Sequence, residues 1–518
     1  MHKLSFNTQL KQISSVILII TFVTLFFHNT SFSALRAGAA KISITTDKPT
    51  ELVNDPMHAR ILVIDDGKTK AIIVAVDIIH ARTKLLSEVR ARVKNELKFN
   101  ADNIIINATH NHHENGQTAE DLVDRIVGGI KKANESLVPV KIGTGKGIEN
   151  RITMNRRLKL KNGKEWTIRR ATPTPPDEEV AGIVDAFDPE IGILRIDSKD
   201  GKPLAVLYNF AGHPYEGVPN KGASACFPGF ASRTIEENLE NGAVAMYIQG
   251  AAGDITPVLY KDVNAPRPSE ELGTKLGLST LKSLKNISTT DQGDIKVIKE
   301  GLELPVRKDI QMRIDSLEAQ KKVAQDYFKG VGCGAHGAGT SLNFKTFLPL
   351  YIKYMMSEDY PTDYVDRYLQ ENKIGNNDLK YLDEDNRRDI SKYLGNIYTM
   401  EKLILIEANL ANLKGRRAYY LSVNEPFSEE VVGMKIGDYI LVTYPGEIFA
   451  QVGLNIKQKS PNKNTYISGY SNGFVGYSPT VDAYDGEAYE VSLSRLAPEW
   501  QNVYEDKVLE IINKLMSK

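Results

Sequence analysis

The chain has 518 residues, of which 65 are basic and 65 acidic, so its formal net charge is zero. Its 42% hydrophobic and 25% charged residues are typical of a globular protein and exclude collagen-like, largely disordered and polytopic membrane proteins. The balanced charge disfavours a nucleic-acid-binding protein, because such proteins usually carry a basic excess. Two cysteines, Cys226 and Cys333, are too few for a disulfide framework or a cysteine-rich zinc site, and the sequence leaves open whether they pair.

The first 33 residues have the order of a secretory signal peptide. Lys3 and Lys11 precede an apolar run over residues 16–27, and small residues then lead to Ala34. The alternative is an uncleaved membrane anchor, but this run is shorter than the roughly 20 apolar residues that span a bilayer. We therefore predict a signal peptide over residues 1–33 and export of residues 34–518 to the periplasm or beyond the cell.

The segments after the signal peptide predict an α/β fold with a mixed sheet. A strand within residues 34–47 is followed by an apolar hairpin, ARILVIDD and KAIIVAVDII, by a helix over 85–97 and by a strand over 103–108. Further apolar strands are predicted at 191–196, 204–210, 243–248 and 439–444. Strands that alternate with helices of this length favour an α/β sandwich. The charged, helical pattern of about 308–420 predicts a mostly helical insertion in this single domain, with an apolar aromatic patch at 346–356.

The strongest local signal is ATHNHHENG, which directly follows the strand at 103–108. It contains the H-x-H pair His110 and His112, and three of the nine histidines of the chain lie within positions 110–113. In extended backbone, residues i and i+2 point to the same side, so the pair can share a metal or divide metal binding and proton transfer. The alternative is a polar loop in which histidines gather by chance. The H-x-H-x-D-H pattern of metallo-β-lactamase-like hydrolases is not met.

Two other polar segments follow predicted strands. His213 lies directly after the strand at 204–210, where α/β folds keep their sites, although a structural role is an alternative. Asp254 and Thr256 lie in a glycine-rich turn after the strand at 243–248. Small residues there allow a ligand to approach the backbone, but a helix N-cap explains the same two residues.

The C-terminal third adds two candidates. Glu447 follows a Pro-Gly turn after the strand at 439–444, in the first turn of a predicted helix, where the helix dipole also favours an acidic residue. Tyr477 lies near the end of a loop rich in glycine, serine and tyrosine, SGYSNGFVGYSPT.

In chain order, these segments resemble the N-terminal catalytic domain of the neutral/alkaline non-lysosomal ceramidases. ATHNHHENG is similar to the family's THTHSGPG, NFAGH to its F-A-x-H, and ENRITMN to the start of its NRSPxAY segment. QGAAGDITP resembles GDVSPN, YPGEIFAQVG resembles PGEFTTMAG, and SGYSNGFVGYSPT resembles SGLxNxYxxYxTT. The opening LRAGAAKISIT is also similar to the family's start, and the resemblance covers about residues 35–257 and 430–490.

The resemblance implies a zinc-dependent amide hydrolase. The implied zinc ligands are His110, His213, Glu447 and Tyr477. The implied catalytic residues are His112 for proton transfer, Arg151 for the substrate oxyanion, and Asp254 and Thr256 in the segment where the family keeps an active-site serine. Two histidines and a glutamate form an accepted catalytic zinc set that leaves a position for water.

Three departures from the family pattern indicate a divergent member. Thr256 replaces a serine, His113-Glu114 replaces Ser-Gly, and too few residues follow the Tyr477 loop for the family's immunoglobulin-like C-terminal domain.

The sequence therefore predicts an exported zinc hydrolase that cleaves the amide bond of an N-acyl, ceramide-like lipid. The expected partners are a small-molecule or lipid substrate and a transient membrane surface, with no nucleic acid and no obligate protein partner. One alternative is a metal-dependent esterase, lactonase or amidase that acts on small polar or glycan-derived compounds. Another is a non-catalytic exported binding protein. An aromatic patch at 346–356 that lined the pocket mouth would favour a lipid.

Overall fold

The computed structural model describes residues 35–169, 174–215, 217–258, 268–329, 338–357, 365–486 and 488–517. The predicted signal peptide and Cys333 lie outside these ranges. Cys226 is buried, and its Sγ lies 3.2 Å from Asn111 Oδ1. Within the described ranges, no helix has the length and apolar character needed to cross a membrane.

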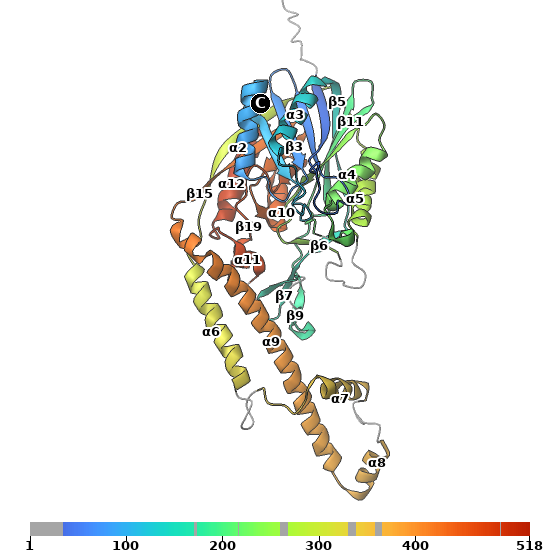
Figure 1. Ribbon diagram of the computed structural model, residues 1–518, viewed down its shortest axis with the longest axis vertical. Helices are drawn as coiled ribbons and strands as arrows, with labels where there is room; N and C mark the ends of the chain where they lie inside the picture. The colour runs from blue at the N-terminus through green and yellow to red at the C-terminus, as the bar shows by residue number, and fades with distance from the viewer. Residues whose placement is uncertain are drawn as a thin grey trace, which may run out of the picture.

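An eight-stranded mixed sheet forms the centre of the molecule (Figure 1), in the order β12-β11-β10-β5-β1-β2-β3-β4. Its strands are β1 (Arg36–Ser43), β2 (His58–Asp65), β3 (Lys70–Val76), β4 (Ile104–Ala108), β5 (Val138–Ile148), β10 (Glu190–Ser198), β11 (Pro203–Phe210) and β12 (Val244–Gln249). The pairs β3–β4 and β11–β12 are parallel. Each is joined by a crossover that contains a helix, α2 (Thr83–Arg92) or α4 (Cys226–Glu237), as parallel neighbours require.

A second sheet packs against the inner face of the first. It has the order β14-β15-β16-β18, with β14 (Ile295–Leu304), β15 (Phe427–Ile436), β16 (Tyr439–Thr443) and β18 (Thr465–Ser468). Apolar side chains of both sheets form one core, including Leu62, Leu194, Met434 and Leu441. The sheets approach so closely that a Cβ on Gly192 would lie 2.1 Å from the ring of Tyr466, which explains a glycine in the middle of β10.

Helices cover both outer faces of this pair of sheets. The helices α3 (Leu122–Glu135), α5 (Ser269–Leu284), α2 and α4 cover the large sheet, while α10 (Ala450–Lys459) and α12 (Trp500–Met516) cover the small one. Because the central strands are buried on both faces, they are continuous apolar runs rather than alternating ones. The four layers confirm the predicted α/β sandwich with a mixed sheet.

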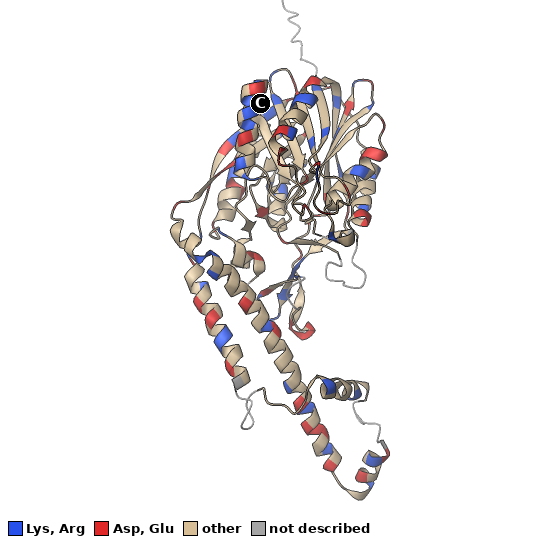
Figure 2. Cartoon of the chain, viewed as in Figure 1, with Lys and Arg blue, Asp and Glu red and all other residues tan. Residues whose placement is uncertain are grey.

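The predicted helical insertion forms a long arm below these layers (Figure 1). Its helices are α6 (Ile310–Lys329), α7 (Phe344–Met356), α8 (Val365–Ile374) and α9 (Asp378–Ser422). α6 packs against the C-terminal half of α9, and α7 packs on the opposite half through Phe347 and Tyr354. The aromatic patch at 346–356 therefore lies on the half of the arm that is farther from the main layers (Figure 1). Figure 2 shows basic and acidic residues interspersed along the arm.

Short elements connect the layers near the site. They are β6 (Thr153–Asn155) paired with β13 (Ile255–Pro257), β17 (Glu447–Ile448) paired with β19 (Tyr477–Ser478), and α11 (Tyr489–Leu493). A separate small sheet contains β7 (Arg157–Leu160), β8 (Glu165–Thr167) and β9 (Val180–Ile183). Short π and 3-10 turns span Val93–Leu97, Ala101–Asn103, Asp177–Glu179, Pro219–Lys221 and Val481–Asp485. Glu447 thus lies in a short strand, and the helix in which the sequence placed it begins only at Ala450.

Candidate active site

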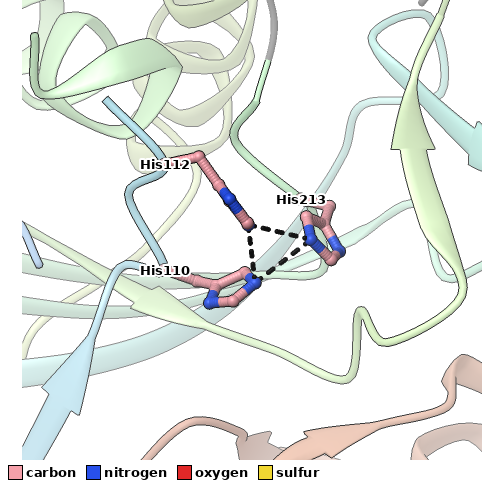
Figure 3. A group of neighbouring side chains, drawn as sticks. All are labelled: His110, His112 and His213. Carbon is pink, nitrogen blue, oxygen red and sulfur yellow. Dashed lines mark hydrogen bonds between the residues drawn. The ribbon is translucent and has the colours of Figure 1, made fainter. Parts of the chain in front are cut away.

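Three histidine side chains converge at the edge of the large sheet where β4 and β11 end (Figure 3). The Nε2 atoms of His110 and His213 are 3.1 Å apart. His112 Nε2 lies 3.0 Å from the former and 3.2 Å from the latter. The carboxyl ends of neighbouring parallel strands are where α/β sheets present ligands, and both predicted histidine segments follow such strands.

The backbone at His110 is strained. Its φ is +62°, in the left-handed region that a non-glycine residue seldom adopts. The extended H-x-H geometry expected from the sequence is therefore wrong at this residue, and the turn itself brings His110 and His112 to the same side. Strain of this kind costs about 1–3 kcal/mol and concentrates at functional sites.

Backbone carbonyls orient two of the three rings. His110 Nδ1 lies 3.0 Å from the carbonyl oxygen of Ile79, and His213 Nδ1 lies 3.1 Å from that of Ala252. The N–H of Ile79 in turn donates to the carboxylate of Glu114. Glu114 thus stabilises the loop that holds His110, a role for the residue that departs from the family's Ser-Gly. His112 Nδ1 has no such carbonyl within the described residues, and its side chain opens onto the cleft.

The protonation state of these rings indicates which kind of ligand they can bind. Burial lowers the pKa of His110 to about 3 and that of His213 well below its usual value, so both rings are neutral at physiological pH. Since their Nδ1 atoms carry the hydrogens that face the carbonyls, their Nε2 atoms carry lone pairs 3.1 Å apart with no proton to share. A tetrahedral zinc ion with Zn–N distances of about 2.0–2.1 Å separates its nitrogen ligands by about 3.3 Å. The three histidines could therefore hold a metal ion.

Glu447 and Tyr477, which the resemblance implied as ligands, lie beside the histidines. Glu447 Oε2 is 3.4 Å from His110 Nε2, and although this oxygen is buried it has no hydrogen-bond partner in the described chain. Burial raises the pKa of Glu447, and a hydrogen bond from Tyr477 opposes that rise. The two residues are register partners in the parallel pair β17–β19. An orphaned carboxylate oxygen next to unprotonated imidazoles suits a cation.

The structure does not bring Arg151 to this site. Its side chain is 61% exposed and is bound to Glu149 and Ser279. Arg156 takes its place five residues later, with 5% of its side chain exposed, and its guanidinium donates to Tyr477 OH at 3.2 Å and to Tyr215 OH at 3.1 Å. Arg151 precedes β6, whereas Arg156 directly follows it, so pairing of β6 with β13 carries the later arginine inward.

Two further contacts fix Arg156. Its Nε donates to Glu490 Oε1 at 2.7 Å, and its Nη2 donates to the carbonyl oxygen of Gly253 at 2.7 Å. Thr167 donates to the other oxygen of Glu490 at 2.7 Å. A rigid, permanently charged group thus lies behind the hydroxyls of Tyr477 and Tyr215.

Asp254 and Thr256, which the resemblance implied as catalytic residues, lie in buried positions away from the cleft. Asp254 is fully buried, pairs with Arg157 at 3.0 Å, and accepts hydrogen bonds from Asn155 Nδ2 and from the backbone N–H of Ala450. Thr256 is buried in β13, its hydroxyl finds no partner among the described residues, and it does not line the cleft. With its oxygens engaged in these bonds, Asp254 is a structural link between β6, β13 and α10 rather than a proton carrier.

Replacing Asp254 with alanine is expected to lower the free energy of unfolding by about 3–5 kcal/mol, because it leaves the buried guanidinium of Arg157 without one of its two carboxylates. Urea unfolding followed by circular dichroism measures this loss. The exposed Asp482 is the matched control, whose alanine variant should change stability by less than about 0.5 kcal/mol. Unchanged stability together with lost turnover would instead assign Asp254 a part in the chemistry.

Sequence reasoning missed several residues of the site. His80 follows β3 and stacks on Phe474 with ring centroids 3.5 Å apart, Tyr470 packs on His110 at 4.2 Å, and Tyr215 contacts the ring of His213 at 4.5 Å. A histidine after the strand KAIIVAV was the available signal for His80. The adjacent arginines in TMNRRLKL, an unusual pair within a strand-like segment, were the signal for Arg156.

His110 and His112 open into a cleft of about 720 Å³. One wall is formed by the end of β3 and the start of α2, another by the loop before β19, and a third by the last turns of α9, which contribute Arg416 and Tyr419. The insertion therefore takes part in the cleft through its C-terminal end. The aromatic patch at 346–356 lies outside the cleft and gives no evidence for or against a lipid.

Comparison with known proteins agrees with this arrangement. Residues 46–266, which include all three histidines, match the family described as neutral/alkaline non-lysosomal ceramidase, N-terminal. This match confirms the resemblance seen in the sequence. No curated protein sequence matches the chain.

Two solved structures share the fold. The neutral ceramidase from Pseudomonas aeruginosa has a TM-score of 0.57 and 17% identity, over 94% of this chain and 75% of that chain. A ceramidase complexed with C2 has a TM-score of 0.59 and 17% identity, over 93% of this chain and 75% of that chain. Together, the family match and the fold support a ceramidase-like hydrolase.

Proposed function

We propose that this chain, whose residues 46–266 match the ceramidase N-terminal family, is an exported zinc-dependent amidase that hydrolyses an N-acyl, ceramide-like lipid. The observation that carries the proposal is the convergence of three imidazole nitrogens within 3.2 Å of one another, two of them with lone pairs directed at each other. Neutral imidazole is the form that binds a metal.

The donor set favours zinc. His110, His213 and Glu447, with Tyr477 beside them, would hold the ion, since two histidines and a carboxylate are a recurrent catalytic zinc set. When bound, zinc supplies Lewis acidity that polarises a carbonyl and lowers the pKa of water. The carbonyls of Ile79 and Ala252 fix the ring orientation of the two histidine ligands, as outer contacts of metal sites commonly do.

The residues around the histidines suit amide hydrolysis. In the overall reaction, the oxygen of water bonds to the carbonyl carbon, the C–N bond breaks, and the nitrogen takes up a proton, which gives a carboxylate and an amine. His112 opens onto the cleft and is suited to transfer that proton, because its Nδ1 is not tied to a backbone carbonyl. Arg156, whose guanidinium donates to the Tyr477 hydroxyl, supplies a permanent positive charge for the oxygen on which negative charge develops.

Removal of metal from the purified protein tests this function. Dialysis against a chelator is expected to reduce the release of fatty acid from N-acyl substrates by at least about a hundredfold, and one equivalent of zinc should restore it. Circular dichroism before and after dialysis controls for unfolding. Amide hydrolysis that survives complete metal removal would contradict the proposal, as would a zinc-loaded protein that cleaves esters but no amide.

A further inference from the structure

The side chains that line the cleft are strongly biased toward positive charge. Four of them are basic, namely Arg82, Lys84, Arg416 and Arg495, and Glu447 is the one acidic residue among the described lining. Glu447 faces His110 and leaves no negative charge to balance the entrance. The bias is local, because the whole chain has no net charge and the arm carries both signs (Figure 2).

Ion pairs do not neutralise these positive charges. Among the described residues, no carboxylate forms an ion pair with Arg82, Arg416 or Arg495, and Lys84 makes only an exposed contact at 3.8 Å with Glu88. Arg416 donates to the carbonyl oxygen of Leu493 at 3.2 Å. A carbonyl fixes the direction of a guanidinium but does not neutralise its charge.

Backbone carbonyl oxygens also hold the guanidinium of Arg495. It donates to the carbonyl oxygens of Val475 and Phe474 at 2.8 Å, in the loop that leads to Tyr477. Glu429 interacts electrostatically with Arg495. Burial raises the pKa of Glu429 to about 7, and the charge of Arg495 opposes that rise. Near neutral pH this carboxyl therefore offsets only part of the charge of Arg495.

Helix stability does not explain the basic residues at the start of α2. Arg82 is its N-cap residue and Lys84 lies in its first turn, where the helix dipole disfavours cations, and no acidic residue occupies that turn. Arg82 also makes no side-chain capping bond. These charges reduce the stability of the helix, and a negatively charged ligand in the cleft would offset them.

We propose that the cleft selects N-acyl substrates that carry an anionic group, such as a carboxylate, sulfonate or phosphate, close to the scissile amide. This inference rests on the proposed amidase function and names the substrate class of the same site. The planar, multi-donor guanidinium groups of Arg82 and Arg416 bind the anion, and Arg495 contributes a fixed positive field. Because Arg416 belongs to α9, the helical insertion determines part of the specificity.

Matched pairs of soluble substrates test the inference with the zinc-loaded protein. N-octanoyltaurine and N-octanoylethanolamine differ by a sulfonate on the amine side, while N-octylsuccinamate and N-octylsuccinamide differ by a carboxylate on the acyl side. We expect kcat/KM to be about 10–100-fold higher for the anionic member of at least one pair, and this advantage to shrink as salt is raised.

Two variants assign the effect to the named residues. The double variant Arg82→Gln, Arg416→Gln should lose at least about tenfold more kcat/KM on the anionic probe than on its neutral twin. Arg417→Gln is the matched control, because Arg417 is the next residue of α9 but binds Gln311 of α6 and does not line the cleft. Its activity should stay within twofold of the parent.

The outcomes separate the two proposals. If neutral amides are hydrolysed as fast as their anionic twins, and the double variant affects both alike, the inference is overturned and the amidase function stands. If no amide is hydrolysed, the amidase function fails, and calorimetry decides the inference. Binding of N-octanoyltaurine that exceeds that of N-octanoylethanolamine and weakens in the double variant would support it, and equal binding of both would overturn it.

Discussion

Replacing both His110 and His213 with alanine is expected to abolish zinc binding and to reduce amide hydrolysis by more than about a thousandfold. Both rings are neutral, both are oriented by backbone carbonyls, and their Nε2 atoms lie 3.1 Å apart, so each contributes a lone pair to the same point. Elemental analysis of the purified protein should give about one equivalent of zinc in the parent and none in the double variant.

His112 provides the contrast for this experiment. Its Nε2 is as close to the other two as they are to each other, but no carbonyl of the described residues fixes its Nδ1. We therefore expect His112→Ala to keep zinc while losing about 10²–10⁴-fold in kcat, the usual contribution of a proton-transfer group. Loss of zinc from His112→Ala would show instead that all three histidines are ligands. The unfolding midpoint of each variant should be measured to exclude a general loss of structure.

Replacing Arg156 with glutamine is expected to lower kcat about a hundredfold with a smaller change in KM. The guanidinium holds the hydroxyls of Tyr477 and Tyr215 and contributes a permanent charge close to the histidines, so its effect is largest when negative charge develops on the substrate. Arg156→Lys should recover part of the loss. Arg151→Gln is the matched control and should change kcat by less than twofold, because Arg151 is exposed, is bound to Glu149 and does not reach the histidines.

A stability control is needed because Arg156 also forms a buried ion pair with Glu490. Removal of one partner from such a pair is strongly destabilising. The double variant Arg156→Gln, Glu490→Gln removes the unpaired carboxylate, so it should regain stability without regaining kcat. If turnover returned together with stability, the role of Arg156 would be structural only.

The fold was predictable where the signal is local. Runs such as KAIIVAV and NIIINA are apolar over their whole length because both faces of those strands are buried, and the structure has strands at both places. His110 and His213 were predictable for a related reason, since each directly follows a buried apolar strand that has a parallel neighbour. Local pattern and topology agree at these residues.

Prediction failed where a distant partner decides the local structure. Glu447 was expected in a helix, but a two-residue pairing with Tyr477 and Ser478 draws the segment into a strand. The resemblance implied Arg151 and gave no sign of Arg156, because motif similarity cannot show which way a side chain points, and pairing of β6 with the remote β13 sets that direction. The position of Arg416 in the cleft could not be predicted from the sequence either, because only packing of α9 against the main layers brings it there.

The wide separation of the site residues along the chain has a consequence for biosynthesis. His110 and His213 are 103 positions apart, and Arg156 and Glu490 are 334 positions apart. Closing such long loops is slow, because the entropy of closure is lost before the contacts form. During translation, the histidines emerge long before Glu447 and Tyr477, so a nascent chain can present imidazoles without the carboxylate and the tyrosine beside them. A chain truncated before β16 would therefore lack that carboxylate and that tyrosine and would not complete the candidate site.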